Sequence, residues 1–366
     1  MSSDVLEYRL FSDFDLQDPF FDSLRKSYSG FDDWFNRKAA AGEKAYTVYE
    51  DSSIVAFLYL KEENDDDYSV VPILSGRRLK IGTFKVDFDH HSSIGKRLFA
   101  ITMRTFAAGE YPYVYVTTFD APHTQGLRHM FEQYGFERYG SKGEEEVWVK
   151  VRPAHIDHAV DVYKRYPFLD IQEDTRSIAF PLLSYGRKAT FLPIYPLWHQ
   201  RLFTSRLANE SKTIIPDETR VNSIEKIYLT SISAVGVLRA GDVLLIYRTA
   251  PRGTVARYTA VVTAFCTVVE VKNIRDFKTF DEFKRYERGR SVFTEDELKN
   301  FYRTGKYPYI LTFLENFSFH TPYPTRGQLL DAGLMNGEYP AGQLISSAQL
   351  RKIIELGGTG ESFIID

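Results

Sequence analysis

Apolar and polar positions in the first 151 residues switch between the period of strands and the period of helices. Helix signals include Asp18 as an N-cap followed by Pro19 at the first helical position, and a helical run that ends at Gly42. A further helix places apolar side chains at i, i+3, i+4 and i+7 and ends at Gly135. Strand-like runs occupy 45–50, 53–63, 78–88, 113–119 and 144–151. The alternation predicts an α/β (α+β) fold in which helices flank a mixed sheet.

The pattern changes after residue 151. Residues 152–222 contain prolines and aromatic residues without a clear period, and we expect a connector there. From 223 onward, β-branched and aromatic residues predict strands. Short helices interrupt them, each opened by a capping box at Thr279, Thr294, Thr325 or Ser346. Residues 223–366 therefore predict a small β-barrel with short helices.

Composition narrows the class of protein. The chain has 366 residues, of which 43% are hydrophobic and 15% aromatic, enough to build cores and too many for a disordered chain. No window of 18 uncharged apolar residues predicts a transmembrane helix, and the first residues do not resemble a signal peptide. The single cysteine, Cys266, lies in an apolar run and is expected to be buried. We expect a cytoplasmic protein with no membrane partner.

Charge is distributed unevenly along the chain. Residues 1–150 hold 18 Lys and Arg against 25 Asp and Glu, whereas residues 201–310 hold 19 against 13. Opposite net charge in the two halves predicts two domains with different partners. Nucleic-acid binding by the second half is allowed by this excess, and a solvated mixed surface explains it equally well.

The stretch "DFDHHSSIGKRLF" (87–99) carries the strongest chemical signal. It joins a predicted strand to a predicted helix, and the first N–H groups of a helix have no internal partners and suit an anion. Gly95 lets a ligand approach the backbone. The predicted phosphate site comprises His91, Ser92, Ser93, Ile94, Gly95 and Lys96. An ordinary capped turn that binds nothing is the alternative. A metal at His90 and His91 is rejected because no further ligands are suitably spaced.

Residues 81–108 resemble the acetyl-CoA-binding core of GCN5-related N-acetyltransferases (GNAT). The family's R/Q-x-x-G-x-G/A motif aligns with 90–95, where only Gly95 matches strictly, and "FEQYGF" (131–136) resembles another family element. The resemblance implies that Phe84, Lys85 and Val86 contact the pantetheine arm and the thioester carbonyl. Phe131 replaces the family's usual catalytic tyrosine, which makes Tyr134 a candidate general acid.

Two carboxylates are candidates for the base that removes a proton from an acceptor amine. Glu62 and Glu63 end a predicted strand near the expected opening of the cleft. A solvated strand end is an equally good explanation of both.

The stretches "DPFFDSLRKSY", "HTQGLRHMFEQYGF" and "IYLTSISAVGVLRAGDVLLIYRTA" resemble acetyltransferase-like proteins proposed to be bacterial toxins of toxin–antitoxin pairs, in which a PUA/ASCH-like domain follows. The resemblance covers residues 1–150 well and 223–366 moderately. This implies a GNAT-like domain over 1–151, a connector over 152–222 and a PUA/ASCH-like, RNA-binding domain over 223–366. A basic face for RNA would comprise Tyr247, Arg248, Arg257, Arg288 and Arg290, although ordinary strand-surface arginines are the alternative.

Two functions from different classes follow. The first is an acetyl-CoA-dependent N-acetyltransferase that acts on a protein amine or an RNA-linked amine, such as an aminoacyl-tRNA, with a toxin role and an antitoxin partner implied by the resemblance. The second is a catalytically degenerate GNAT-fold scaffold whose PUA-like domain binds RNA.

Overall fold

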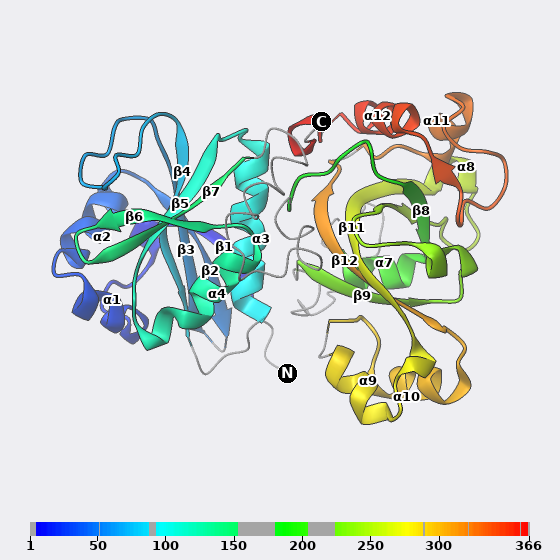
Figure 1. Cartoon of the computed structure of the whole chain (residues 1–366), viewed down its shortest axis with the longest axis horizontal. Coiled ribbons are helices and arrows are strands. Elements are labelled where there is room, and N and C mark those ends of the chain that lie inside the picture. The colour runs from blue at the N-terminus through cyan, green and yellow to red at the C-terminus, as the bar shows by residue number, and fades with distance from the viewer. Residues whose placement is uncertain are drawn as a thin grey trace.

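The computed structural model describes residues 5–50, 52–87, 93–152, 180–203, 224–287, 290–320, 322–358 and 360–364. Two sheets lie side by side, each with its own helices (Figure 1). The mixed α/β class predicted from the sequence is confirmed.

The first sheet has seven strands in the order β1-β2-β3-β4-β5-β7-β6. All its pairs are antiparallel except β4 with β5, which are parallel. The strand bounds are β1 Val5–Leu10, β2 Lys44–Glu50, β3 Ser53–Glu63, β4 Arg78–Val86, β5 Tyr113–Phe119, β6 Glu137–Lys142 and β7 Glu145–Val151. The five predicted strands are present, and β1 and β6 at the two edges are additional.

Helices cover both faces of this sheet. One face packs on α3 (Ser93–Ala108) and α4 (Gln125–Gln133) through a core that includes Leu98 and Phe131. The opposite face packs on the 3-10 turn η2 (Pro19–Phe21), α1 (Asp22–Ser27) and α2 (Phe31–Ala40) through an aromatic core. Asp18 caps η2 by accepting a hydrogen bond from the Phe20 N–H at 2.8 Å, as the sequence predicts.

The second sheet has six strands in the order β13-β8-β10-β11-β12-β9. β8 and β10 are parallel and the other pairs are antiparallel. The bounds are β8 Ala189–Ile194, β9 Glu225–Thr230, β10 Val243–Arg248, β11 Val261–Asn273, β12 Tyr309–Ser318 and β13 Leu344–Ile345. The prediction of a strand-rich second part is confirmed, and closure into a barrel stays a prediction.

The predicted connector contributes to this second sheet. Within 152–222 the structure places β8 and the helix α7 (Pro196–Leu202), and β8 pairs along its whole length with β10. Every residue of β8 is buried, so its sequence shows no alternation of polar and apolar positions. Pro193 is accommodated because, among the described strands, β13 pairs only with Ala189 and Thr190 and leaves that side of β8 unpaired beyond them.

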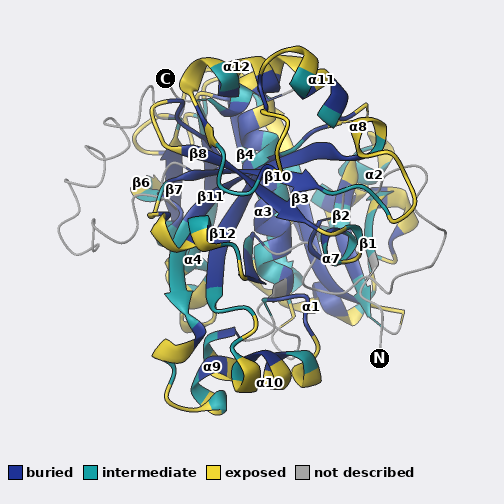
Figure 2. Cartoon of the chain, turned by 90° about the vertical axis from the view of Figure 1, so that its right-hand side faces the viewer, coloured by how far each residue is buried: buried dark blue, intermediate teal, exposed yellow. Residues whose placement is uncertain are grey.

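Short helices surround the second sheet, namely α8 (Ala256–Thr259), α9 (Phe280–Glu287), α10 (Glu295–Thr304), α11 (Arg326–Asp331) and α12 (Ser347–Leu356). The predicted capping boxes at Thr294, Thr325 and Ser346 are confirmed. At Thr279 the hydroxyl accepts from the Glu282 N–H, while the Glu282 carboxylate accepts from the Lys278 N–H instead of closing the box. Figure 2 shows exposed residues on the outer faces of α10 and α12, and both helices bury residues against the core.

Helix α3 lies between the two halves (Figure 1). Its Ala107 belongs to a core of the second half, and its Arg104 lies 3.5 Å from the Glu315 carboxylate on β12. The core under α3 in turn includes Leu314 from β12. The described helices include none long and apolar enough to cross a membrane.

Candidate functional site

Strands β4 and β5 are paired over only part of their length. Leu79, Lys80 and Ile81 of β4 pair with Val114–Val116 of β5, and no described residue of β4 beyond Ile81 pairs with β5. A register shift on β3 leaves Gly82 without a cross-strand partner directly after the last β4–β5 pair. A Cβ at Gly82 would lie 2.7 Å from the Tyr59 ring, so this bulge requires glycine. The sheet therefore opens between β4 and β5, and polar backbone groups of β4 face the opening.

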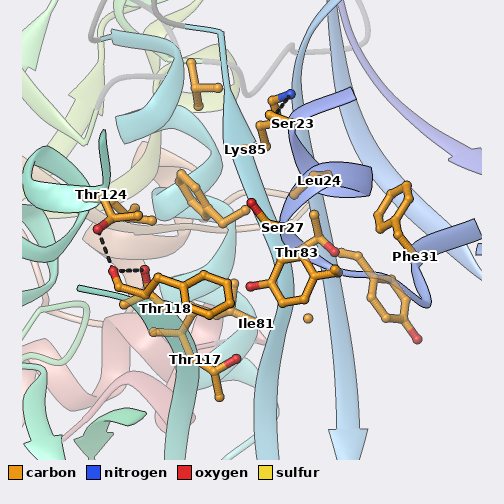
Figure 3. A pocket seen from close by; sticks show the side chains of 18 of the residues that line it. Ser23, Leu24, Ser27, Phe31, Ile81, Thr83, Lys85, Thr117, Thr118 and Thr124 are labelled. Carbon is orange, nitrogen blue, oxygen red and sulfur yellow. Dashed lines mark hydrogen bonds between the residues drawn. The ribbon is translucent and has the colours of Figure 1, made fainter. Parts of the chain in front are cut away.

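A cavity of about 2010 Å³ occupies this opening and extends to both faces of the sheet. Its walls come from α1 and α2 on one side, β4 and β5 in the middle, and the starts of α3 and α4 on the other (Figure 3). Basic side chains outnumber carboxylates in the lining. The basic members are Lys26, Arg37, Lys38, Lys61, Lys80, Lys85, Lys96 and Lys142, and the acidic members are Asp18, Asp22, Glu63, Asp87 and Glu145.

Helix α1 spans the opening on one face. On the β4 side, the Lys85 ammonium donates to the Phe20 carbonyl and to the Ser23 hydroxyl (Figure 3). On the β5 side, the Tyr28 ring lies 5.4 Å from that of Phe119, and the Tyr28 hydroxyl donates to Glu145 at 2.7 Å. The splayed strands are thus bridged by a helix instead of by strand pairing.

Most of the predicted coenzyme-binding residues gather at this cavity. Phe84, Lys85 and Val86 line it from β4, and Gly95 and Lys96 line it from α3. A Cβ at Gly95 would meet only Val86, at 3.7 Å, so a side chain added there would not collide with the protein.

The other predicted members of the phosphate site have different placements. Ile94 is buried in the core beneath α3 and does not face the cavity. Ser93 begins α3. His91 and Ser92 lie outside the described residues.

The three predicted catalytic residues are placed differently from one another. Glu63 lines the cavity. Glu62 lies on the opposite face of β3, where it accepts hydrogen bonds from the Tyr111 hydroxyl at 2.8 Å and from Arg77 at 3.1 Å. Tyr134 is only 4% exposed, and its ring packs 4.9 Å from that of Phe99 in the core. The sequence therefore placed one of the three in the cavity.

Glu145 is a cavity residue that sequence reasoning missed. It begins β7 opposite Phe119 of β5 and accepts hydrogen bonds at one carboxylate oxygen from Tyr28 and, at 3.0 Å, from the Thr117 hydroxyl. The run of three glutamates at 144–146 hides it, because only alternation along the strand separates their faces. Glu146, one position further, points to the other face and accepts a hydrogen bond from the Trp148 indole.

The predicted RNA-binding residues do not form a basic face. Tyr247 is 2% exposed within a core, and Arg248 is also buried, because β10 is covered on both faces. Arg257 is exposed and forms a two-point ion pair with Asp331, each contact 2.7 Å long. The remaining two are Arg290, which pairs with Glu225, and Arg288, which lies outside the described residues. Tyr247 and Arg248 are buried because a core packs on each face of this sheet.

Two further expectations concern reactive groups. Cys266 is fully buried in a core, as predicted, and burial raises the pKa of its thiol well above the ordinary value. Within the ranges that the structure describes, no group of three or more His, Cys, Asp or Glu side chains is arranged to hold a metal ion.

No protein-family model matches the sequence, and no curated protein matches it. Solved structures with a similar fold include an acetyltransferase of the GNAT family from Listeria monocytogenes (15% identity, covering 40% of this chain and 94% of that chain, TM-score 0.30). They also include the PaiA N-acetyltransferase of Thermoplasma acidophilum in complex with coenzyme A (12% identity, covering 40% of this chain and 99% of that chain, TM-score 0.27). A third is the ZmASCH protein of Zymomonas mobilis (12% identity, covering 46% of this chain and 96% of that chain, TM-score 0.31). Likenesses of this size do not establish an activity.

Proposed function

We propose that the chain is an acetyl-CoA-dependent N-acetyltransferase. The observation that carries this proposal is the opening between β4 and β5, which leads to the start of α3 on one face and to α1 on the other. An extended acyl-carrying arm threaded through such an opening presents its thioester to a substrate on the far face. The large cavity favours this function over a degenerate scaffold, because strand pairing along the full length of β4 would have filled the opening.

The residues present fit coenzyme A. Polar backbone groups of β4 beyond Ile81 are available to the amides of a pantetheine arm. Gly95 and Lys96 face the cavity at the start of the 16-residue helix α3, where the helix dipole and free N–H groups favour phosphate. The bulge at Gly82 re-aims the β4 backbone at the narrow end of the opening, where an oxyanion at the thioester carbonyl would need a donor.

The proposal is tested by titrating acetyl-CoA into the full chain by calorimetry and repeating the titration with Gly95→Glu. A Cβ fits at Gly95 and the residue lines the cavity, so we expect a folded variant whose added charge and bulk at the phosphate position weaken binding by at least ~100-fold. Gly337→Glu is the matched control, because Gly337 is exposed, a Cβ added there would meet no atom within 4 Å, and the residue does not line the cavity. Equal affinity in folded Gly95→Glu and wild type would overturn the placement of the coenzyme.

An RNA-linked acceptor and a toxin role are narrower hypotheses within this proposal. They rest on the resemblance in the sequence and on the net positive charge of 201–310. The arrangement of Arg257 and Arg290, each paired with a carboxylate, gives RNA little to contact at those two positions. Two measurements separate these hypotheses, namely retention of tRNA at low salt and growth of bacteria that express the wild type or Gly95→Glu. Failure to retain tRNA removes the first, and equal growth removes the second.

A further inference from the structure

The cavity holds two carboxylates on the same face of the sheet, near neighbouring positions of β5. Glu63 accepts a hydrogen bond from the Tyr115 hydroxyl at 2.7 Å, and Glu145 accepts one from the Thr117 hydroxyl at 3.0 Å. Residues two apart on a strand lie about 7 Å from each other on one face. The carboxylates of Glu63 and Glu145 are therefore two neighbouring candidates for binding a cationic group, and their surroundings differ.

Glu63 is surrounded by cations. Its carboxylate lies 3.1 Å from Arg78, 3.2 Å from Lys61 and 3.7 Å from Lys80. Burial alone would raise the pKa of Glu63, but Lys80, the Tyr115 hydroxyl and Lys61 outweigh burial and lower it. A carboxylate held ionised in this way is a poor proton acceptor and serves as the counter-ion of the arginine and lysines.

Glu145 is held by neutral donors only. Tyr28 and Thr117 both donate to Oε1, and no described residue forms an ion pair with Glu145 or hydrogen-bonds its Oε2. Burial, followed by the hydrogen bond to Glu145, raises the pKa of Tyr28, so its hydroxyl keeps its proton and remains a donor. Glu145 thus brings an uncompensated negative charge, in a fixed orientation, to a cavity whose lining is otherwise mainly basic.

Aromatic side chains also line the cavity, and two of them, Tyr28 and Phe119, lie beside Glu145. Tyr28, Phe31 and Trp34 line it from α1 and α2, and Phe119 lines it from the end of β5. Rings beside a carboxylate suit a molecule that carries a cation next to an apolar body, because the ring faces attract the cation and the body buries apolar surface.

We infer that Glu145 binds the ammonium group of the acceptor, and that the acceptor is a primary amine attached to an aromatic or apolar body. This inference rests on the proposed function, which supplies the acetyl donor. Thr117 is a positioning residue, since it acts on the acceptor through Glu145, and Tyr28 orients Glu145 through its hydroxyl while its ring lines the cavity.

Oε2 of Glu145 takes one proton from the bound ammonium, which leaves a neutral amine. The amine nitrogen then attacks the thioester carbon, so that a C–N bond forms and the C–S bond breaks. The nitrogen loses a second proton to the leaving thiolate, which gives an amide and free coenzyme A thiol, and Glu145 returns its proton to water.

The test measures release of the coenzyme A thiol by the full chain with phenylalaninamide and with glycinamide, which lacks the aromatic body. We expect phenylalaninamide to have the higher kcat/KM. Glu145→Gln keeps the size of the side chain and removes its charge, and we expect it to lower kcat/KM for phenylalaninamide by roughly 100-fold or more while the Kd of acetyl-CoA stays unchanged. Glu145→Asp should retain more activity than Glu145→Gln, which shows that the charge matters.

Glu144→Gln is the matched control, because Glu144 is exposed, lies outside the cavity lining and loses the same charge. We expect its kcat/KM to stay within about twofold of the wild type, the usual range for a surface residue without contacts. Tyr28→Phe should lower kcat/KM by a smaller factor than Glu145→Gln.

Wild-type activity in folded Glu145→Gln, or wild type that binds acetyl-CoA but acetylates neither amine, would overturn the inference and leave the coenzyme proposal standing. Wild type that does not bind acetyl-CoA would overturn both.

Discussion

The two sheets differ in whether neighbouring strands stay paired. In the first sheet, β4 and β5 separate after Ile81 and leave a cavity that reaches both faces. In the second, β11 stays paired with β12 from Ala264 to Asn273, and its partner β10 is buried along its entire length. One sheet exposes backbone to a ligand where the other satisfies its backbone internally.

Both halves contain a buried cation that is paired with a carboxylate. In the second half, Lys226 is fully buried and lies 3.1 Å from the Glu315 carboxylate, which Arg104 of α3 also approaches. In the first half, Arg78 is buried and lies 3.1 Å from the Glu63 carboxylate, and the buried Lys150 donates to the Tyr134 carbonyl at 2.6 Å. The two halves therefore differ in strand pairing rather than in the pairing of buried charges, and Arg104 of α3 links them through Glu315.

The largest expected effect comes from breaking the buried ion pair between Lys226 and Glu315 in the second half. Glu315→Ala leaves the Lys226 ammonium buried without its carboxylate, which should destabilise the protein by about 3–5 kcal/mol. Denaturant unfolding measures the change. Glu295→Ala is the control, since Glu295 forms its ion pairs with Lys284 and Lys299 on the surface and should shift the midpoint little. A Glu315→Ala midpoint equal to that of the control would show that the pair contributes nothing.

The same pair should make stability depend on acid. Burial would raise the pKa of Glu315, but Arg104 and Lys226 outweigh it and lower the pKa below the ordinary value of 4.5. Because the pKa of Glu315 is lower in the folded protein than in the unfolded chain, Glu315 takes up its proton at a higher pH in the unfolded chain. Acid therefore favours unfolding, and stability is lost as pH falls below about 4.5 toward the pKa of the folded protein. Glu315→Gln should flatten this part of the profile, and an unchanged acid slope would contradict the assignment.

A smaller effect is expected at the buried lysine of the first half. Burial lowers the pKa of Lys150 from 10.5 to about 7. Between these values the unfolded chain holds a proton that the folded chain has lost, so stability should rise as pH increases from about 7 toward 10.5. Lys150→Met should reduce this rise in urea melts collected across the window, whereas Lys142→Met, at a half-buried lysine paired with Asp67, should not. If the stability of Lys150→Met rose with pH as much as that of the wild type, the rise could not be assigned to Lys150.

The sequence predicted the strands and helices with strong hydrophobic periodicity and missed those without it. β6 has the polar sequence ERYGSK and an exposed edge position, so burial imposes no pattern on it. The sequence did not predict β8 for the opposite reason, because this strand is buried on both faces and contains Pro193. Both misses arise from tertiary contacts that local patterns do not report.

The candidate site was predicted in part. Phe84, Lys85, Val86, Gly95 and Lys96 share one short stretch of chain, so a motif could reveal them. Glu145 contacts Tyr28, which lies 117 residues away in the sequence, so no local sequence pattern indicates that the two residues are neighbours. Tyr247 and Arg248 lie on a strand that helices and loops cover on both faces, a tertiary arrangement that no local sequence signal reports.

The most direct test of the account is amide hydrogen exchange of the full chain with and without acetyl-CoA. The opening in the first sheet predicts protection of β4 beyond Ile81 and of the first turn of α3, with β10 and β12 unchanged, and it predicts that Gly95→Glu abolishes the protection. Protection confined to the second sheet, or none at β4 and α3 at saturating acetyl-CoA, would contradict the placement of the coenzyme between the splayed strands.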